Sequence, residues 1–283
     1  MPTYAVTGAT GHLGRLAVSE LLARGVPATD VVAVVRTPAK AADLAEQGVQ
    51  VREGDYSRPE TLPAALAGVD RLLLVSGSEP GQRVAQHTNV LEAAQAAGVQ
   101  HVVYTSILRA DTTGNPLAGE HRGTEEVLRA SGLSAAVLRN GWYTENYTGQ
   151  LGQYLERGEV LGAAGSGRVS AAPRADYAAA AVTALLEGAE GVFELGGPAF
   201  DFPELARTVS EVTGQRVVSR DLPPAEYAAA LQGAGLDAGT AGFVAALDES
   251  IARGELETDS DDLARLLGRP ATPLADVVRT ARA

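Results

Sequence analysis

Residues 7–14, Thr-Gly-Ala-Thr-Gly-His-Leu-Gly, decide the fold of this 283-residue chain. They follow a short apolar run, Tyr4–Thr7, and open a stretch with helical periodicity, His12–Arg24. Glycines at such a strand-to-helix turn let the backbone approach a pyrophosphate, which the N–H groups at the start of the helix can bind. Alone, the GxxGxxG spacing is also compatible with a plain turn, so the surrounding sequence must decide between the two.

The surrounding sequence repeats the same strand-and-helix unit. Because the apolar residues of the expected strands form near-continuous blocks, we expect strands that are covered on both faces. The chain is therefore predicted to be an α/β protein with a doubly wound parallel Rossmann sheet. The expected strands are Tyr4–Thr7, Val31–Val35, Val49–Glu53, Arg71–Val75, His101–Thr105, Ala135–Leu138 and Val192–Leu195, and the expected helices are His12–Arg24, Ala39–Glu46, Glu60–Leu66, Val84–Ala97, Gly123–Ala130 and Asp176–Glu187.

The rhythm changes near Gly141, which predicts a second part of the molecule. We expect residues 1–140 to form the dinucleotide-binding Rossmann domain, completed by about 168–197. Residues 141–167 and 198–283 are expected to form a small, mainly helical lobe on the substrate side, with one short strand near Val217–Ser219. Three local features are also predicted: a capping box formed by Ser57 and Glu60, an N-cap at Asp176, and solvent-exposed carboxylates at Asp248-Glu249.

The end of the second expected strand indicates which cofactor the glycine stretch binds. Sites specific for NAD usually place an Asp or Glu there, whereas an Arg accommodates the 2′-phosphate of NADP. Here Arg36 follows the strand, Lys40 lies four residues later, and no carboxylate occurs before Asp43. We therefore predict NADPH (NADP) as the cofactor, the alternative being that Arg36 only solvates the end of the strand.

Composition excludes several classes of function. The net charge of −12 and the pI near 4.8 argue against nucleic-acid binding, which needs a basic face. With no cysteine, the chain has no disulfide or thiolate chemistry, and its four histidines lack metal-ligand spacing, so no metal is expected. No apolar run is long enough to span a membrane, and the N-terminus lacks the features of a signal peptide, so we expect a cytoplasmic protein with no membrane contact.

Several strings resemble a known family, the NmrA-like branch of the atypical short-chain dehydrogenase/reductases, and within it the bacterial type-2 NAD(P)H:quinone oxidoreductases. The resemblance rests on the glycine stretch, on Arg36, on the Asp55-Tyr56 turn and on several longer strings, and it covers almost the whole chain. One departure is His12, where those enzymes have a glutamine. The resemblance implies an oxidoreductase that transfers hydride from NADPH to a small-molecule quinone. The strings are residues 34–41, 72–79, 138–147, 174–181 and 267–270.

The usual proton relay of short-chain dehydrogenases, a Tyr-x-x-x-Lys pair, cannot exist in this chain. Lys40 is the only lysine, and no tyrosine lies between Tyr104 and Tyr143. No catalytic residue is therefore assigned. Quinone reduction does not need such a relay, because a quinone is already electrophilic and the protein has chiefly to position the reactants. A non-catalytic NADP(H) redox sensor of the NmrA type is the alternative function.

The candidate site residues come from the ends of the expected strands. An aromatic group after the sixth strand is predicted to bind a flat acceptor, although aromatics there can also serve only to pack the sheet against the lobe. His121 is interpreted as a helix-start residue, with a hydrogen-bond donor near the substrate as the alternative. The oligomeric state is left open between a monomer and a homodimer. The predicted cofactor-binding residues are Gly8, Thr10, Gly11, His12, Leu13, Gly14, Arg36, Lys40, Ser76, Gly77, Ser78 and Asn140, and the predicted substrate-binding residues are Trp142, Tyr143, Asn146 and Tyr147.

Overall fold

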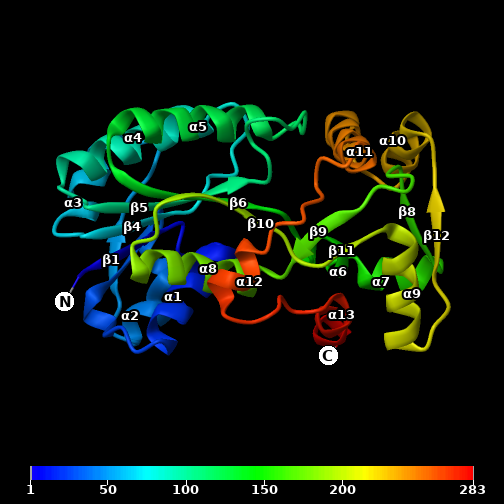
Figure 1. Cartoon of the computed structure of the whole chain (residues 1–283), viewed down its shortest axis with the longest axis horizontal. Helices are drawn as coiled ribbons and strands as arrows, with labels where there is room; N and C mark the ends of the chain where they lie inside the picture. Colours follow the sequence, from blue (N-terminus) through cyan, green and yellow to red (C-terminus); the bar gives the residue numbers. More distant parts are fainter. Residues whose placement is uncertain (1, 283) are drawn as a thin grey trace.

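The computed structural model describes residues 2–282 and is built around one seven-stranded sheet (Figure 1). Every neighbouring pair in this sheet is parallel, in the order β10-β6-β5-β4-β1-β2-β3. Because the order reverses between β1 and β4, a crevice is expected to open there, at the carboxyl ends of the strands. All seven predicted strands are confirmed: β1 Tyr4–Thr7, β2 Val31–Val35, β3 Gln50–Glu53, β4 Arg71–Leu74, β5 His101–Ile107, β6 Ser134–Asn140 and β10 Gly191–Leu195.

Helices cover both faces of the sheet, as the continuous apolar strands predict (Figure 1). Alternate residues of one strand enter different cores: Val32 packs with Leu72 and Val102 on one face, whereas Ala33 packs with Leu73 and Val103 on the other. All of these side chains are buried. One face carries α3 Leu62–Leu66, α4 Arg83–Ala96 and α5 Ala118–Ser131; the other carries α1 His12–Ala23, α2 Ala42–Glu46, α8 Arg174–Glu187 and α12 Asp262–Leu267, and three 3₁₀ turns span Ala28–Asp30, Pro38–Ala41 and Pro59–Thr61.

The remaining elements form the smaller lobe at the right of Figure 1. The lobe is mainly helical, as predicted, but it also holds two small sheets, β11-β9-β7 and β12-β8. Only β12 was predicted, because the other lobe strands are short and lack the continuous apolar blocks of the large sheet. The strands are β7 Trp142–Tyr143, β8 Glu159–Gly162, β9 Val169–Ala172, β11 Ala199–Phe200 and β12 Val218–Asp221; the helices are α6 Glu145–Thr148, α7 Leu151–Arg157, α9 Phe202–Thr213, α10 Pro224–Gly233, α11 Ala238–Ala252 and α13 Leu274–Arg282.

Strand β9 bears on the predicted division into domains. Its residues lie in the segment that was expected to complete the Rossmann domain, yet it pairs with β7 and β11 of the lobe. The large sheet is instead completed by β10, which pairs with β6. The division itself stays a prediction. No helix among residues 2–282 is long and apolar enough to cross a membrane.

Two predicted helix caps are wrong. Ser57 and Glu60 form no capping box: the turn before α3 is held by Asp55, whose carboxylate accepts a hydrogen bond from Ser57 N–H, and by Thr61. The N-cap of α8 is Pro173. Asp176 is instead buried in the first turn of the helix, where its carboxylate accepts hydrogen bonds from Arg269 and Thr272, which tie α8 to the C-terminal segment.

Asp248 is not solvent-exposed, contrary to its prediction. Its side chain is buried in the lobe, and one carboxylate oxygen accepts a hydrogen bond of 2.8 Å from the Ala163 N–H. Burial raises the pKa of Asp248 to about 7, and the nearby Asp221 carboxylate adds to this effect, while the Ala163 bond opposes it. This burial could not be predicted from the sequence, because the segment that covers Asp248 lies 85 residues earlier in the chain.

Replacing Asp248 by Asn is expected to stabilise the protein above neutral pH. The pKa of Asp248 is higher in the folded than in the unfolded chain, so its contribution to stability falls as pH rises from about 4 to about 7. The neutral amide removes this penalty, which is at most about 4 kcal/mol at pH 8, and its oxygen can still accept from Ala163. Urea unfolding at pH 5 and pH 8 measures the effect. The exposed control Glu92→Gln should change stability equally at both values, and an equal response from Asp248→Asn would contradict the expectation.

Candidate active site

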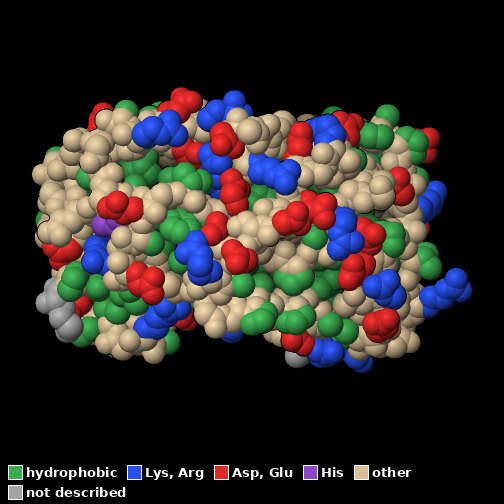
Figure 2. Space-filling view, in the orientation of Figure 1, with side chains coloured by type: hydrophobic (Ala, Val, Ile, Leu, Met, Phe, Trp, Pro, Cys, Tyr) green, Lys and Arg blue, Asp and Glu red, His purple; other side chains and the backbone are tan. Residues whose placement is uncertain are grey.

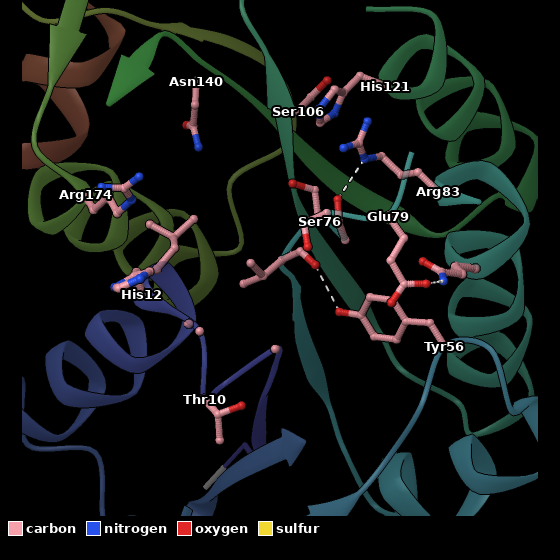
Figure 3. A pocket seen from close by; sticks show the side chains of 18 of the residues that line it. Thr10, His12, Tyr56, Ser76, Glu79, Arg83, Ser106, His121, Asn140 and Arg174 are labelled. Carbon is pink, nitrogen blue, oxygen red and sulfur yellow. Dashed lines mark hydrogen bonds between the residues drawn. The ribbon is translucent and has the colours of Figure 1, made fainter. Parts of the chain in front are cut away.

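A cavity of about 860 Å³ runs along the carboxyl ends of six strands of the large sheet (Figure 3). It begins beside β3 and β2, passes the start of α1, and continues past β4, β5 and β6 to the first residues of the lobe. Its lining comprises residues 8, 10–14, 34, 36, 40, 54–56, 75–79, 83, 86, 106–107, 117, 121, 140–143, 146 and 174.

The start of α1 forms a cradle for an anion. Gly8 has a positive φ of 60°, and a Cβ on Gly14 would lie 2.4 Å from the Gly8 carbonyl oxygen, so both positions require glycine. Gly11, the N-cap, is exposed to the cavity, and a Cβ there would meet only that oxygen, at 3.2 Å. The helix has no side-chain cap and no acidic residue in its first turn. Its first N–H groups are therefore left for a phosphate.

Basic side chains lie at the β2 end of the cavity. Arg36 and Lys40 both line it, and the Arg36 side chain is 67% exposed. Its guanidinium donates to the Glu79 carboxylate at 2.7 Å, and the other Glu79 oxygen accepts from Gln86 at 2.7 Å. Since an exposed ion pair is weak, a phosphate group that bonds Arg36 through two N–H groups can displace Glu79.

The loop that follows β4 is held by buried side chains beneath it. Its N–H groups at residues 75, 76 and 77 donate to Thr7 Oγ1, Thr105 Oγ1 and His87 Nε2, at 3.0, 2.9 and 3.0 Å respectively. Because His87 Nε2 accepts, its proton is on Nδ1, 3.0 Å from the Thr124 hydroxyl. Burial, helped by Arg83, lowers the pKa of His87 to about 3, so this support is neutral at physiological pH.

The far end of the cavity is walled by Tyr143, which its neighbours hold in place. The Arg174 guanidinium stacks on the Tyr143 ring at 4.5 Å, and the Tyr177 ring packs edge-on against it at 5.5 Å. Arg174 also donates to Asn146 Oδ1 at 2.9 Å. Asn140, at the end of β6, is buried, and its Oδ1 has no hydrogen-bond partner among residues 2–282. Asn140 lines the cavity, but this oxygen is enclosed by the protein.

A buried ion-pair network adjoins this end. Ser106, which lines the cavity at the end of β5, donates to Glu125 at 2.6 Å, so its hydroxyl hydrogen is already used and its oxygen can act only as an acceptor for a ligand. Glu125 is bound by two nitrogens of Arg139, which also contacts Glu194 and Asp111 at 2.9 Å. Burial lowers the pKa of Arg139, but the hydrogen bonds with its three carboxylates outweigh burial, so its pKa lies above the ordinary value.

The structure brings nearly all the predicted site residues into this one cavity. Every residue predicted to bind the cofactor lines it, as do Trp142, Tyr143 and Asn146. Tyr147 does not, and its prediction as a substrate-binding residue is corrected here. It is buried in the lobe core, where its ring packs edge-on against Phe200 and Phe202. The pattern of residues 142–147 is that of a strand, a turn and a short helix, and this change of direction takes Tyr147 away from the cavity. The ligand roles of the other residues stay predictions.

Arg83, Ser106 and His121 are among the cavity residues that were missed or given another role. Arg83 is a buried cation at the first position of α4 that binds the Gly77 carbonyl at 2.9 Å and Glu120 at 2.8 Å. The available signal was an arginine at the start of a helix that follows a strand of the sheet. Ser106 directly follows the predicted strand His101–Thr105, so its position at the carboxyl end of that strand could be predicted from the sequence. His121 lies in the first turn of α5 and also lines the cavity. It reaches the cavity only because α5 packs on β5.

Charged side chains on the face drawn in Figure 2 show no comparable concentration. On this face, Lys and Arg are interspersed with Asp and Glu over both the sheet and the lobe. Exposed ion pairs occur on the surface, such as that of Arg207 with Glu204 and Glu211. Such pairs contribute little to stability.

Comparisons with known proteins agree with the geometry of this cavity. Residues 8–188 match the family model described as NAD(P)H-binding. Quinone oxidoreductase 2 of Escherichia coli is 47% identical over 97% of this chain and 96% of its own. The crystal structure of the E. coli NADPH-dependent quinone oxidoreductase complexed with NADPH superimposes with a TM-score of 0.96 at 45% identity, covering 99% of this chain and 100% of the other. A Citrobacter triphenylmethane reductase complexed with NADP(H) is similar as well, with a TM-score of 0.91, 39% identity and 99% coverage of both chains.

Proposed function

Since the chain belongs to the NAD(P)H-binding family, we propose that it is an oxidoreductase that transfers hydride from NADPH to a quinone. The observation that carries the proposal is the shape of the cavity. It continues from the glycine cradle, past the sheet, to the wall formed by Tyr143 and Asn140, so it has room for an acceptor beyond the dinucleotide. The near full-length similarity to quinone oxidoreductase 2 supports the same acceptor class.

The residues of the cavity fit NADPH. The cradle at Gly8, Gly11 and Gly14 has the close backbone approach that a pyrophosphate needs, and Arg36 with Lys40 would hold the 2′-phosphate. Asn140, which lines the far end of the cavity, would contact the nicotinamide. NADPH, when bound, supplies the hydride.

The protein's own contribution is to place and enclose the reactants. Tyr143, clamped by Arg174 and Tyr177, offers a fixed flat surface against which a quinone ring can pack. Since the sole lysine, Lys40, lies at the β2 end, no Tyr-Lys pair delivers a proton to the acceptor. A reduced quinone can take its second proton from water, so positioning is the main task of the site.

The remaining assignments belong to the same proposal. Trp142, Tyr143 and Asn146 are the substrate-side residues, and residues 1–140 with about 168–197 bind the dinucleotide. The small-molecule partner is a quinone. The compartment is the cytoplasm, where the enzyme would draw on the NADPH pool, and neither nucleic acid nor membrane takes part.

Anaerobic stopped-flow oxidation of NADPH by benzoquinones and naphthoquinones tests the function. The parent protein should turn over, and Arg36→Glu should raise the KM for NADPH about ten- to a hundredfold while changing the KM for NADH much less. The reason is that the substitution replaces a phosphate partner by a second carboxylate beside Glu79. Arg207→Glu, an exposed arginine of the lobe, serves as the charge-matched control. A parent protein that binds NADPH but oxidises it with no quinone would contradict the proposal and favour a redox sensor.

A further inference from the structure

His121 presents one ring nitrogen to the cavity and uses the other to contact the sheet. Its Nδ1 lies 2.7 Å from the hydroxyl of Tyr104, a fully buried residue of β5 that does not line the cavity. The Nε2 atom takes no hydrogen bond from residues 2–282 and is not enclosed by them. His121 itself lines the cavity at the end where Ser106 and Asn140 also lie (Figure 3). Nε2 is therefore the nitrogen available to a ligand.

The surroundings of His121 keep its imidazole neutral. Burial lowers the pKa of His121 to about 3, and Arg83 and His87, both from α4, lower it further. Burial also raises the pKa of Tyr104 well above its ordinary value, so its hydroxyl keeps its hydrogen, which it can donate to His121 Nδ1. The carboxylates nearest this pair, Glu120 and Glu125 on α5, are bound to Arg83 and Arg139. The imidazole is thus neutral, and when Tyr104 donates to Nδ1 its single hydrogen lies on Nε2.

We propose that His121 donates a hydrogen bond from Nε2 to a carbonyl oxygen of the acceptor, and that Tyr104 is the positioning residue that holds this tautomer. The inference rests on the proposed function and names the group that binds the reacting oxygen. In a site without a Tyr-Lys pair, His121 takes over the donor role but not the proton transfer. Arg83, the buried cation beside it, strengthens the N–H as a donor.

The role of His121 follows from where negative charge develops during the reaction. The quinone gains a hydride, that is, one proton and two electrons, from NADPH, which is oxidised to NADP⁺. The product is the hydroquinone monoanion, which takes one proton from water and leaves as the hydroquinone. A preorganised N–H aimed at the oxygen that becomes negative stabilises the transition state more than the substrate. His121 keeps its proton throughout, because Tyr104 cannot replace it without becoming an anion in a buried site.

The test compares three variants of the full-length protein in NADPH oxidation with one naphthoquinone. His121→Leu should lower kcat roughly a hundredfold with the KM for NADPH unchanged, the loss typical of removing one such donor. His121→Gln, which can place an amide N–H near the position of Nε2, should recover most of that loss. Tyr104→Phe should lower kcat to an intermediate level, since both tautomers then become populated. The control His101→Gln lies at the opposite end of β5, beside Ser134, and should behave like the parent.

The pH profile separates a neutral donor from an acid. With His121 neutral, kcat of the parent should be flat from pH 5.5 to pH 8, whereas a protonated imidazole acting as an acid would lose activity as pH rises through about 6.5. Equal kcat for His121→Leu and the parent would overturn the inference while leaving the quinone reductase function intact. A parent protein without quinone turnover would instead overturn the proposed function, on which the inference rests. Thermal unfolding of each variant shows that a lost kcat does not reflect a lost fold.

Discussion

The Gly11→Val variant is expected to fold normally and to lose measurable NADPH binding. Gly11 is the N-cap of α1 and is exposed to the cavity, so a branched side chain there occupies the place of the pyrophosphate. Its Cβ would meet only the Gly8 carbonyl oxygen, at 3.2 Å, which a shift of a few tenths of an ångström relieves. We expect a loss in affinity of at least about a thousandfold, or roughly 4 kcal/mol.

Fluorescence titration with NADPH measures this affinity, and thermal unfolding checks the fold. Gly152→Val is the matched control, because a Cβ at this helical glycine of α7 meets nothing within 4 Å. Gly14 is less suited to the experiment, since a Cβ there collides with the backbone of Gly8 at 2.4 Å and damages the turn itself. If Gly11→Val bound NADPH with the parent's affinity, the dinucleotide site would have to lie elsewhere and the proposed function would fail.

Arg139→Met is expected to cause the largest loss of stability, about 3–5 kcal/mol. The side chain of Glu125 is 3% exposed, and Arg139 is its only ion-pair partner among residues 2–282. Methionine fills a similar volume but leaves this carboxylate buried and uncompensated, which is costly. Because Glu125 also accepts a hydrogen bond from the Ser106 hydroxyl at the cavity wall, kcat should fall together with stability.

Guanidinium unfolding of two further variants checks the cause. Glu125→Gln should lower the free energy of unfolding less than Arg139→Met does, because Arg139 then keeps Glu194 and Asp111 as partners. Arg207→Met removes an exposed arginine from a surface ion pair and should change stability by no more than about 1 kcal/mol. Equal losses from Arg139→Met and Arg207→Met would show that the buried network contributes no more than a surface pair.

The layered sheet and the dinucleotide end of the site were predictable because both depend on local sequence. Apolar blocks such as Val31–Val35 can be buried only as strands covered on both faces, and helices between them make the sheet parallel. The cradle at Gly8 and Gly14 needs glycine for reasons of backbone geometry over seven residues. The position of Arg36 at the cofactor end was predictable because Arg36 comes directly after β2 in the sequence.

The sequence alone did not show where side chains distant in the chain meet. Tyr147 has the same character as Tyr143, and only the turn into α6 sends one into the lobe core and leaves the other at the cavity. The burial of Asp248 depends on the packing of α11 against the segment that follows β8, 85 residues earlier. The short strands of the lobe are stabilised by their partners, not by their own propensity, so they leave little trace in the sequence.

The sequence by itself therefore determined the fold class, the glycine cradle, the basic cofactor end and the absence of a Tyr-Lys pair, because each depends on residue type within a short window. Tertiary structure decided which groups line the acceptor end and in which protonation state. His121 shows the difference: its place in the first turn of a helix was visible, but its contact with Tyr104 arises only when α5 packs on β5. Burial and the Arg83 charge, which keep that imidazole neutral, are properties of the folded environment and not of the residue.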